Sequence, residues 1–278
     1  MKSLKSEYLA PIPDRPYHYI VSYSGGIGSA VSCLLAKENN LDYTAVFADT
    51  LIEDEDLYRF NNDIEVALDR PIIRLCCDMN PWDVYIKNRY IGNSRTAHCS
   101  QQLKTDVIRD YMKTECSHEH LCLILGMSLE EYERINRAKV NWKPIEVDSL
   151  LVRYRYSSRE MQEEKLKEYG IELPRLYSLG FPHNNCGGFC CRSGMTQFAT
   201  LLKHFPKRYQ WHVEQEERAY NAIGPTAVPF IRWTWKGKLY YLRMSEFRDM
   251  IHSGALTPPL YEYGGCGCFT DEEIKEST

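Results

Sequence analysis

The stretch Ser24-Gly25-Gly26-Ile27-Gly28-Ser29 decides the fold of this 278-residue chain. It follows an apolar run, Tyr19-Ile20-Val21, that predicts a buried strand, and it precedes apolar residues at the spacing of a helix. N–H groups at the start of a helix lack intrahelical partners, and the helix dipole adds positive charge there. Glycines let the chain approach an anion closely, and both serines carry hydroxyl donors. The sequence therefore predicts that a phosphate group binds to this turn.

Three kinds of phosphate-binding loop compete for this stretch. A Walker-type loop requires Gly-Lys followed by Ser or Thr, and the chain contains no such tripeptide. A dinucleotide fingerprint is partly met, since Asp49 follows Gly26-x-Gly28 as a ribose-binding acid would, but Val31 stands where its third glycine or alanine belongs. The Ser-Gly-Gly-x-x-Ser loop is matched at every fixed position. On this motif the chain resembles the PP-loop (N-type) ATP pyrophosphatase superfamily, and a glycine turn without a ligand is the alternative.

Length and composition allow one substantial core with an appendage, since the chain has 278 residues and 44% of them are hydrophobic. The net charge of −4 argues against nonspecific nucleic-acid binding by the whole chain, although local basic patches could still bind nucleic acid. Neither a secretory signal nor a long apolar run is evident, so we expect a cytoplasmic protein without membrane partners. Eleven cysteines in a reducing compartment favour metal, cluster or redox chemistry over disulfides.

Strand and helix patterns alternate along the first half of the chain. Further strands are predicted at residues 43–48, 71–75 and 121–125, with amphipathic helices between them. We therefore expect an α/β fold, a parallel twisted sheet with helices on both faces. The resemblance implies a Rossmann-like sheet of the adenine nucleotide alpha hydrolase-like kind. Ligands bind beyond the carboxyl ends of such strands, which predicts that Ser24, Asp49 and Gly126 share one rim.

The pattern changes after about residue 141, where turn-rich sequence separates helices expected at 159–169 and 196–220. A basic and aromatic stretch predicts a hairpin that turns at Lys236-Gly237. We expect two parts, a PP-loop nucleotide-binding domain over residues 1–180 and a cysteine-rich C-terminal subdomain over residues 181–278 packed on it.

Further segments resemble, in order, the phosphoadenylyl-sulfate (PAPS) reductase-like branch of the superfamily. These segments are Asp49-Thr50, the stretch from His98 to Lys104, and Gly126-x-x-x-x-Glu131-x-x-Arg134. The resemblance implies two sets of residues. The nucleotide-binding set is Ser24, Gly25, Gly26, Gly28, Ser29, Asp49, Thr50, Gly126 and Glu131, and the catalytic set is Cys99, Lys104 and Arg134.

Each of these assignments has a structural alternative. Asp49 could cap the helix that begins near Glu53, and Lys104 could be an ordinary solvated lysine. Glu131 and Arg134 lie three residues apart, so on a helix they could form a surface ion pair of about 0–1 kcal/mol.

Two cysteine-rich segments lie further along the chain. Their thiols are separated by glycines at the spacing of metal ligands, and they are Cys186, Cys190, Cys191, Cys266 and Cys268. Four thiolates would suit a [4Fe–4S] cluster or a tetrahedral Zn²⁺. The pattern resembles the signature of cluster-bearing relatives, including the DndC-like DNA phosphorothioation proteins, but its second half reads Cys-x-Cys. A redox-active thiol pair and plain buried cysteines are the alternatives.

Two departures from the family pattern affect the expected chemistry. Ile27 and Gly28 stand where most superfamily loops carry Lys and Asp, so a cation and a Mg²⁺ ligand are lost. The Glu-Cys-Gly-x-His tail of the reductases is also missing, and we expect no sulfite-producing PAPS reduction unless Cys266 or Cys268 substitutes.

The resemblance implies an enzyme that binds ATP or a PAPS-like adenine nucleotide with Mg²⁺. We expect it to adenylate an acceptor with release of pyrophosphate, coupled to sulfur transfer through the cysteines. The acceptor could be a nucleic acid, a free nucleotide or a sulfur-carrier protein, and the sequence does not decide among them. A homodimer is a further expectation. Two alternatives stay open: a nucleotide-sensing accessory protein with a degraded loop, and a nicotinamide-dependent oxidoreductase using Gly26, Gly28 and Asp49.

Overall fold

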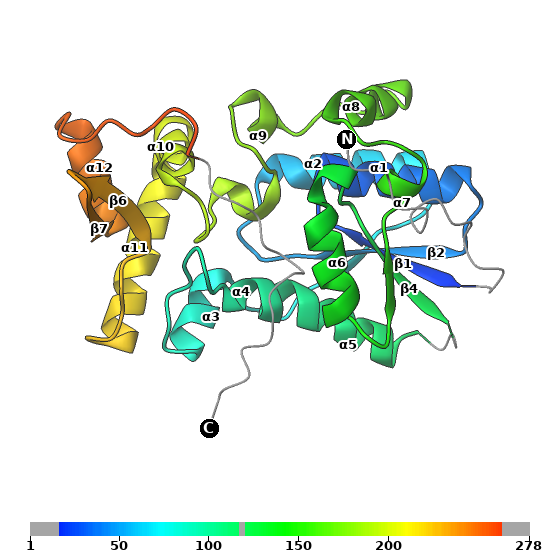
Figure 1. The fold of residues 1–278 in the computed structure, drawn as a ribbon, viewed down its shortest axis with the longest axis horizontal. Helices are drawn as coiled ribbons and strands as arrows, with labels where there is room; N and C mark the ends of the chain where they lie inside the picture. Colours follow the sequence, from blue (N-terminus) through cyan, green and yellow to red (C-terminus); the bar gives the residue numbers. More distant parts are fainter. Residues whose placement is uncertain (1–16, 117–119, 263–278) are drawn as a thin grey trace.

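The computed structural model describes residues 17–116 and 120–262. Its centre is a five-stranded sheet in the order β3-β2-β1-β4-β5, and every neighbouring pair is parallel. The strands are β1 (His18–Tyr23), β2 (Tyr43–Ala48), β3 (Ile73–Leu75), β4 (Leu121–Leu125) and β5 (Glu146–Asp148). The predicted α/β fold with a parallel sheet is confirmed, and helices cover the sheet in Figure 1.

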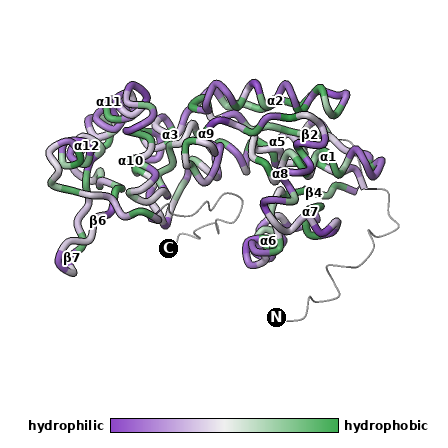
Figure 2. The backbone as a smooth tube through the Cα atoms, turned by 90° about the horizontal axis from the view of Figure 1, so that it is seen from above, coloured by the Kyte–Doolittle hydropathy of each residue, from purple (hydrophilic) through white to green (hydrophobic). Residues whose placement is uncertain are grey.

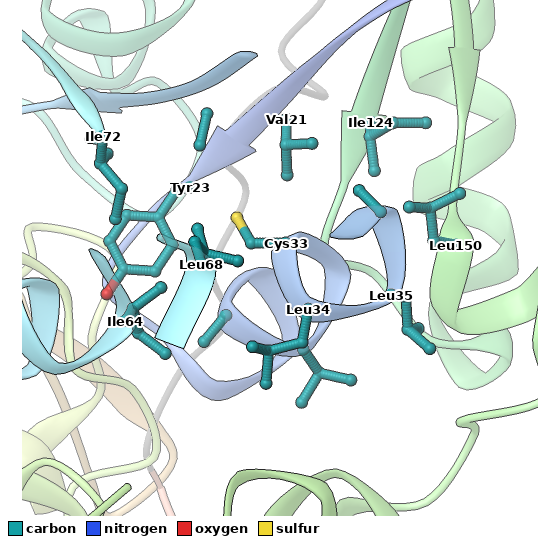
Figure 3. Close-up of a cluster of buried hydrophobic side chains, with 14 of the residues drawn as sticks. Val21, Tyr23, Cys33, Leu34, Leu35, Ile64, Leu68, Ile72, Ile124 and Leu150 are labelled. Carbon is teal, nitrogen blue, oxygen red and sulfur yellow. The ribbon is translucent and has the colours of Figure 1, made fainter. Parts of the chain in front are cut away.

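Alternate residues of β1 face opposite layers, as the two-residue period of a strand requires. Val21 packs with α1 (Ile27–Glu38), α2 (Glu55–Leu68), α7 (Leu150–Arg153) and α8 (Arg159–Glu168). Figure 3 shows this layer, where Val21 and Tyr23 of β1 pack with Cys33, Ile64 and Leu150 of the helices. Ile20 faces the other layer, which α5 (Asp106–Thr114) and α6 (Tyr132–Asn141) supply. The sheet is therefore buried on both sides.

A second hydrophobic core lies beside the sheet and contains few strand residues. Its centre is an aromatic cluster in which the Trp82 ring lies 5.3 Å from that of Phe189 and 6.1 Å from that of Phe230. Trp82 comes from α3 (Pro81–Lys87), so this core joins the first half of the chain to the last. The other contributors are α9 (Arg175–Ser178), α10 (Met195–His204), α11 (Pro206–Ile223), α12 (Met244–His252) and the hairpin β6 (Ile231–Trp235)–β7 (Lys238–Leu242). The two cores occupy opposite ends of the molecule in Figure 2.

The short elements between them are α4 (His98–Ser100), η2 (Gln101–Thr105), η3 (Leu129–Glu131) and η4 (Asn185–Gly188). The single helix expected at 196–220 is wrong, because the chain breaks at Phe205 into α10 and α11. Pro206 disfavours helical geometry in the residue before it, and Phe205 adopts φ −133° and ψ 61°. The boundary expected at residue 180 stays a prediction. No helix of the described residues is long and apolar enough to span a bilayer.

Candidate functional site

A cavity of about 310 Å³ opens at the carboxyl ends of β1 and β4. Its lining brings together several predicted site residues that are far apart in the sequence. They are Ser24, Gly26, Gly28, Ser29, Lys104, Gly126, Glu131 and Arg134. The predicted rim is present, since Ser24, Asp49 and Gly126 each follow the last residue of a strand.

The two serines of the loop hold its shape. The Ser24 N–H donates to Ser29 Oγ at 3.0 Å, and Ser29 Oγ donates to the Gly26 carbonyl at 2.9 Å. Gly26 caps α1 without a side-chain hydrogen bond, and the first turn of α1 contains no acidic residue. The positive end of the dipole of this 12-residue helix is therefore not compensated by a carboxylate of its own first turn.

Close backbone contacts explain why this loop has glycine at position 28. A Cβ atom on Gly28 would lie 2.6 Å from the Gly126 carbonyl oxygen. A Cβ atom on Gly126 would in turn lie 2.4 Å from the Ser29 nitrogen. An aspartate at position 28 would therefore require the chain after β4 to move. Ile27 is 1% exposed and packs in the core, so a lysine there would have to bury its ammonium group.

Three cationic side chains line the cavity in place of the missing loop lysine. Lys104 is 7% exposed and lies in the widened π-type turn η2, a geometry that often occurs at functional sites. Arg134 forms an ion pair with Glu131, whose other oxygen accepts from the Ser128 N–H at 3.2 Å. Arg159 lies over the Tyr177 ring, 4.2 Å from its centroid. These cations come from three different elements and meet at one cavity.

Glu53 also lines the cavity, although it belongs to none of the sequence motifs that predict site residues. Burial raises the pKa of its carboxyl group above the ordinary value, opposed mainly by the charge of Lys104. The Thr50 hydroxyl donates to Glu53 Oε1 at 2.7 Å, and the Cys186 N–H donates to Oε2. The Lys104 ammonium lies 3.7 Å from the Cys186 thiol. The Glu53 carboxyl group and the Lys104 ammonium group therefore line the cavity, and the Cys186 thiol lies against the ammonium group.

Asp49 lies behind the cavity rather than in its wall. Its side chain is 0% exposed, and its carboxylate accepts from Arg74 at 2.7 Å, from Tyr58 at 2.9 Å and from the Leu51 N–H at 2.7 Å. A carboxylate with these partners supports the loop after β2. This placement weighs against the dinucleotide alternative, which requires Asp49 to reach a ribose. The helix cap that the alternative assigned to Asp49 belongs to Asp54.

The opposite wall comes from the region after residue 141. The Tyr177 hydroxyl faces the backbone N–H groups of Ile27 and Asn184, and burial raises its pKa above the ordinary value. The Asn184 amide nitrogen donates to the Gly25 carbonyl at 2.8 Å, whereas its Oδ1 has no hydrogen-bond partner although Asn184 is 1% exposed. A buried acceptor without a partner on a cavity wall is suited to a ligand N–H or O–H group.

The cysteines divide between two places. The Cys191 thiol is buried near the thiols of Cys190 and Cys99, and these neighbours, together with burial, raise its pKa above the ordinary value. The Tyr85 hydroxyl lies 3.4 Å from the Cys99 sulfur, and Cys99 does not line the cavity. Cys186 lies instead beside Lys104. Cys266 and Cys268 lie outside the described residues, and within residues 17–116 and 120–262 no group of three His, Cys, Asp or Glu side chains is arranged to hold a metal ion.

Comparison with known proteins gives one family match. The family model described as phosphoadenosine phosphosulfate reductase domain matches residues 18–140. The match runs from β1 to α6 and includes the loop, Lys104 and the Glu131–Arg134 pair. It ends before Tyr177, Asn184 and the paired cysteines. A search of curated proteins found no match.

Proposed function

Because residues 18–140 belong to the phosphoadenosine phosphosulfate reductase domain family, a member of the PP-loop adenine nucleotide alpha hydrolase-like superfamily, we propose that the cavity binds ATP or a PAPS-like adenine nucleotide. Proteins of this family are generally enzymes that bind adenine nucleotides. One observation carries the proposal: the start of α1 and three cations from separate elements line the same cavity. Positive charge held in this way matches a polyphosphate.

The chemistry that fits this charge is adenylation of an acceptor. An acceptor oxygen attacks the α-phosphorus, the bond from that phosphorus to the bridging oxygen breaks, and pyrophosphate leaves with the electron pair. Lys104, Arg134 and Arg159 would stabilise the charge that develops on the pyrophosphate. They would take over the role of the lysine that Ile27 replaces.

Magnesium would neutralise the same phosphates. Mg²⁺ in nucleotide sites is bound mainly by the phosphates and water, with one or two protein carboxylates. Glu53 and Glu130 both line the cavity, so its wall contains carboxylates that could replace the missing aspartate. We assign the magnesium contact to these two residues.

Sulfur transfer coupled to adenylation is the second part of the proposal. The Cys99 and Cys190 thiols lie near that of Cys191, and we propose that these residues hold a [4Fe–4S] cluster or Zn²⁺ only together with Cys266 and Cys268. The last described residue, Glu262, is bound to Thr196, which follows Cys191 by five residues. The Glu262 N–H donates to Thr196 Oγ1 at 2.9 Å, and the Thr196 N–H donates to the Glu262 carbonyl at 3.2 Å. Cys266 follows Glu262 by four residues, so the two cysteine segments can supply one ligand set.

Metal analysis tests this part separately from nucleotide binding. Protein purified without oxygen is expected to contain iron and sulfide, or zinc, and Cys191→Ser should lower the metal content several-fold. Cys33→Ser is the matched control, because Cys33 is buried in the core of the sheet. Metal-free protein with all thiols reactive would contradict a cluster.

Calorimetry with ATP, together with an assay of pyrophosphate release, tests the nucleotide proposal. Release is expected with at least one acceptor among single-stranded DNA, double-stranded DNA, tRNA and a sulfur-carrier protein. Lys104→Ala should weaken ATP binding about 10- to 100-fold, as expected for loss of a charge-assisted contact of about 1.5–3 kcal/mol. Lys113→Ala, an exposed lysine on α5, should have no effect. Absence of ATP binding would contradict the proposal.

A nucleotide-binding accessory protein is the second candidate function. Gly28 favours it, because the space for the usual aspartate is filled by the Gly126 carbonyl. ATP binding without pyrophosphate release in any acceptor screen would select this function. A homodimer also stays a proposal, and sedimentation of the intact chain would test it.

A further inference from the structure

The β6–β7 hairpin carries a row of aromatic side chains that begins at Trp233, beside the second core, and continues onto the exposed surface. Trp233 and Trp235 lie on the same side of β6, with ring centroids 5.6 Å apart and an interplanar angle of 27°. Tyr240 pairs with Trp233 across the hairpin, and their centroids are 5.5 Å apart. The end of this row at Trp235 is accessible to solvent, since Trp235 is 50% exposed. The hairpin thus presents a row of rings that ends in a half-exposed indole.

Positive charge surrounds these rings without any acid in the segment. The chain contains no Asp or Glu between Glu217 and Glu246, although the protein as a whole has a net charge of −4. Lys236 lies 5.5 Å from the Trp235 centroid, and Lys238 lies 5.5 Å from the Tyr240 centroid. Arg232 is exposed on the opposite face beside Tyr241, which is 48% exposed. The charge of this surface is therefore complementary to a polyanion.

The hairpin is held rigidly at its base and extends away from the helices at its tip. Ile231 and Leu242 form the first pair of the ladder and are buried in the second core. Lys236 and Gly237 form the turn with φ values of 49° and 74°, the left-handed geometry of a tight two-residue turn. Figures 1 and 2 place the hairpin at the end of the molecule opposite the sheet. It is accessible to a partner that is much longer than a nucleotide.

We propose that the β6–β7 hairpin binds single-stranded nucleic acid, with bases stacking on Trp235 and the Trp233–Tyr240 pair and phosphates held by Lys236 and Lys238. Sequence-tolerant binding of single strands combines these two features, stacking aromatic rings and a cationic surface. A duplex offers its groove edges and backbone rather than base faces, so the rings favour unpaired bases. A bilayer is a poorer match, because the turn itself is Lys236-Gly237 and would place a charge where an apolar residue is needed. This proposal does not depend on what the cavity binds.

Fluorescence anisotropy with the full-length protein and no ATP tests it. The probes are a labelled 20-nucleotide dT strand and a 20-base-pair duplex of mixed sequence. Trp235→Ala should weaken binding of the dT strand about 10-fold or more. Tyr261→Ala is the matched control, since Tyr261 is an 86% exposed aromatic outside the hairpin. Both variants should unfold at the temperature of the wild type.

Salt dependence provides a second readout that a merely structural role would not change. The double variant Lys236→Ala/Lys238→Ala should lower the slope of log affinity against log salt by about 1.4, because each phosphate of a single strand that a lysine neutralises contributes about 0.7 to the slope. Lys113→Ala should leave the slope unchanged. The proposal is overturned if the wild type does not bind the dT strand, if it binds the duplex equally tightly, or if Trp235→Ala binds as the wild type does. Binding to anionic vesicles in place of the dT strand would also overturn it.

Discussion

The two ends of this molecule differ in how their cores form. The sheet end consists of β1 to β5 and the helices that cover them, and the helical end consists of α3, α9 to α12 and the β6–β7 hairpin. The cavity is lined by residues of the sheet end and by Tyr177 of α9. In the sheet end, each strand is followed by a helix, and the core alternates residue by residue along β1. In the helical end, Trp82 packs against Phe189 and Phe230, which come from distant parts of the chain. The first arrangement follows from local sequence, whereas the second depends on long-range packing.

The two regions also contribute different groups to the cavity. The sheet end supplies the loop, Lys104 and Arg134, which carry backbone donors and charge. The region after residue 141 supplies Tyr177 and Asn184, which contact the loop itself. Charge thus comes chiefly from the family-matched segment, and the fit around the loop comes from residues outside it.

Asp54 joins the two ends, and its loss should have the largest effect. Its buried carboxylate caps α2, accepts from Arg175 at 2.8 Å and accepts from Arg208 at 2.8 Å. Burial alone would raise the pKa of Asp54, but the hydrogen bonds from both arginines lower it below the ordinary value. Asp54→Asn should lower the free energy of unfolding at pH 7 by about 3 kcal/mol, measured in urea.

The effect of Asp54→Asn should depend on pH in a defined direction. Because the folded pKa lies below the unfolded value of about 3.9, the stabilisation is present above that value and is lost as pH falls through the folded pKa. The difference between the wild type and the variant should therefore shrink as the pH falls below about 3.9. Asp63→Asn is the control, since its ion pair with Arg59 is partly exposed and contributes about 0–1 kcal/mol. An equal loss in both variants would show that Asp54 does not join the two ends.

The rim could be predicted from the sequence because it depends on local rules. Ser24 and Gly126 directly follow apolar strand runs, and strands of a parallel sheet end at the same edge. Tyr177 and Asn184 could not be predicted, because α9 and η4 have four residues each and no periodic pattern. Asp49 was placed correctly on the rim, but only the structure shows that its carboxylate is bound to Arg74 and Tyr58.

The close contact of Gly126 with the loop should give the next largest effect. In Gly126→Ala, the new methyl group would lie 2.4 Å from the Ser29 nitrogen, which is backbone and cannot turn aside. We expect a loss of about 1–3 kcal/mol in stability, measured by thermal unfolding, and weaker ATP binding. Gly170→Ala is the control: nothing lies within 4 Å of its Cβ position, and only its φ of 69° adds strain. Normal ATP binding by Gly126→Ala would show that the loop can move away from β4.

Glu216 tests the helical end alone. It is 2% exposed, its Oε2 accepts from the Met244 N–H at 2.8 Å, and burial raises its pKa to about 8. Between the ordinary pKa of 4.5 and about 8, the folded state keeps the proton and the unfolded state releases it. The free energy of unfolding should therefore fall by about 1.4 kcal/mol per pH unit inside this window. Glu216→Gln should remove this slope, whereas Glu217→Gln, at an exposed site, should retain it.

Tyr177→Phe should give the smallest effect, a change in ATP affinity. It tests whether the Tyr177 hydroxyl competes with the nucleotide for the loop. In this structure the Tyr177 hydroxyl faces the Ile27 N–H, one of the donors that a phosphate would use. If the hydroxyl competes with the nucleotide, its removal should tighten ATP binding about 2- to 10-fold, since one such hydrogen bond contributes about 0.5–1.5 kcal/mol. Tyr169→Phe, whose hydroxyl donates to Glu38 away from the cavity, should leave the affinity unchanged in calorimetry. Weaker binding of ATP by Tyr177→Phe would contradict this expectation. The hydroxyl would then donate a hydrogen bond to the nucleotide, and the helical end would bind the nucleotide directly in addition to forming a wall of the cavity.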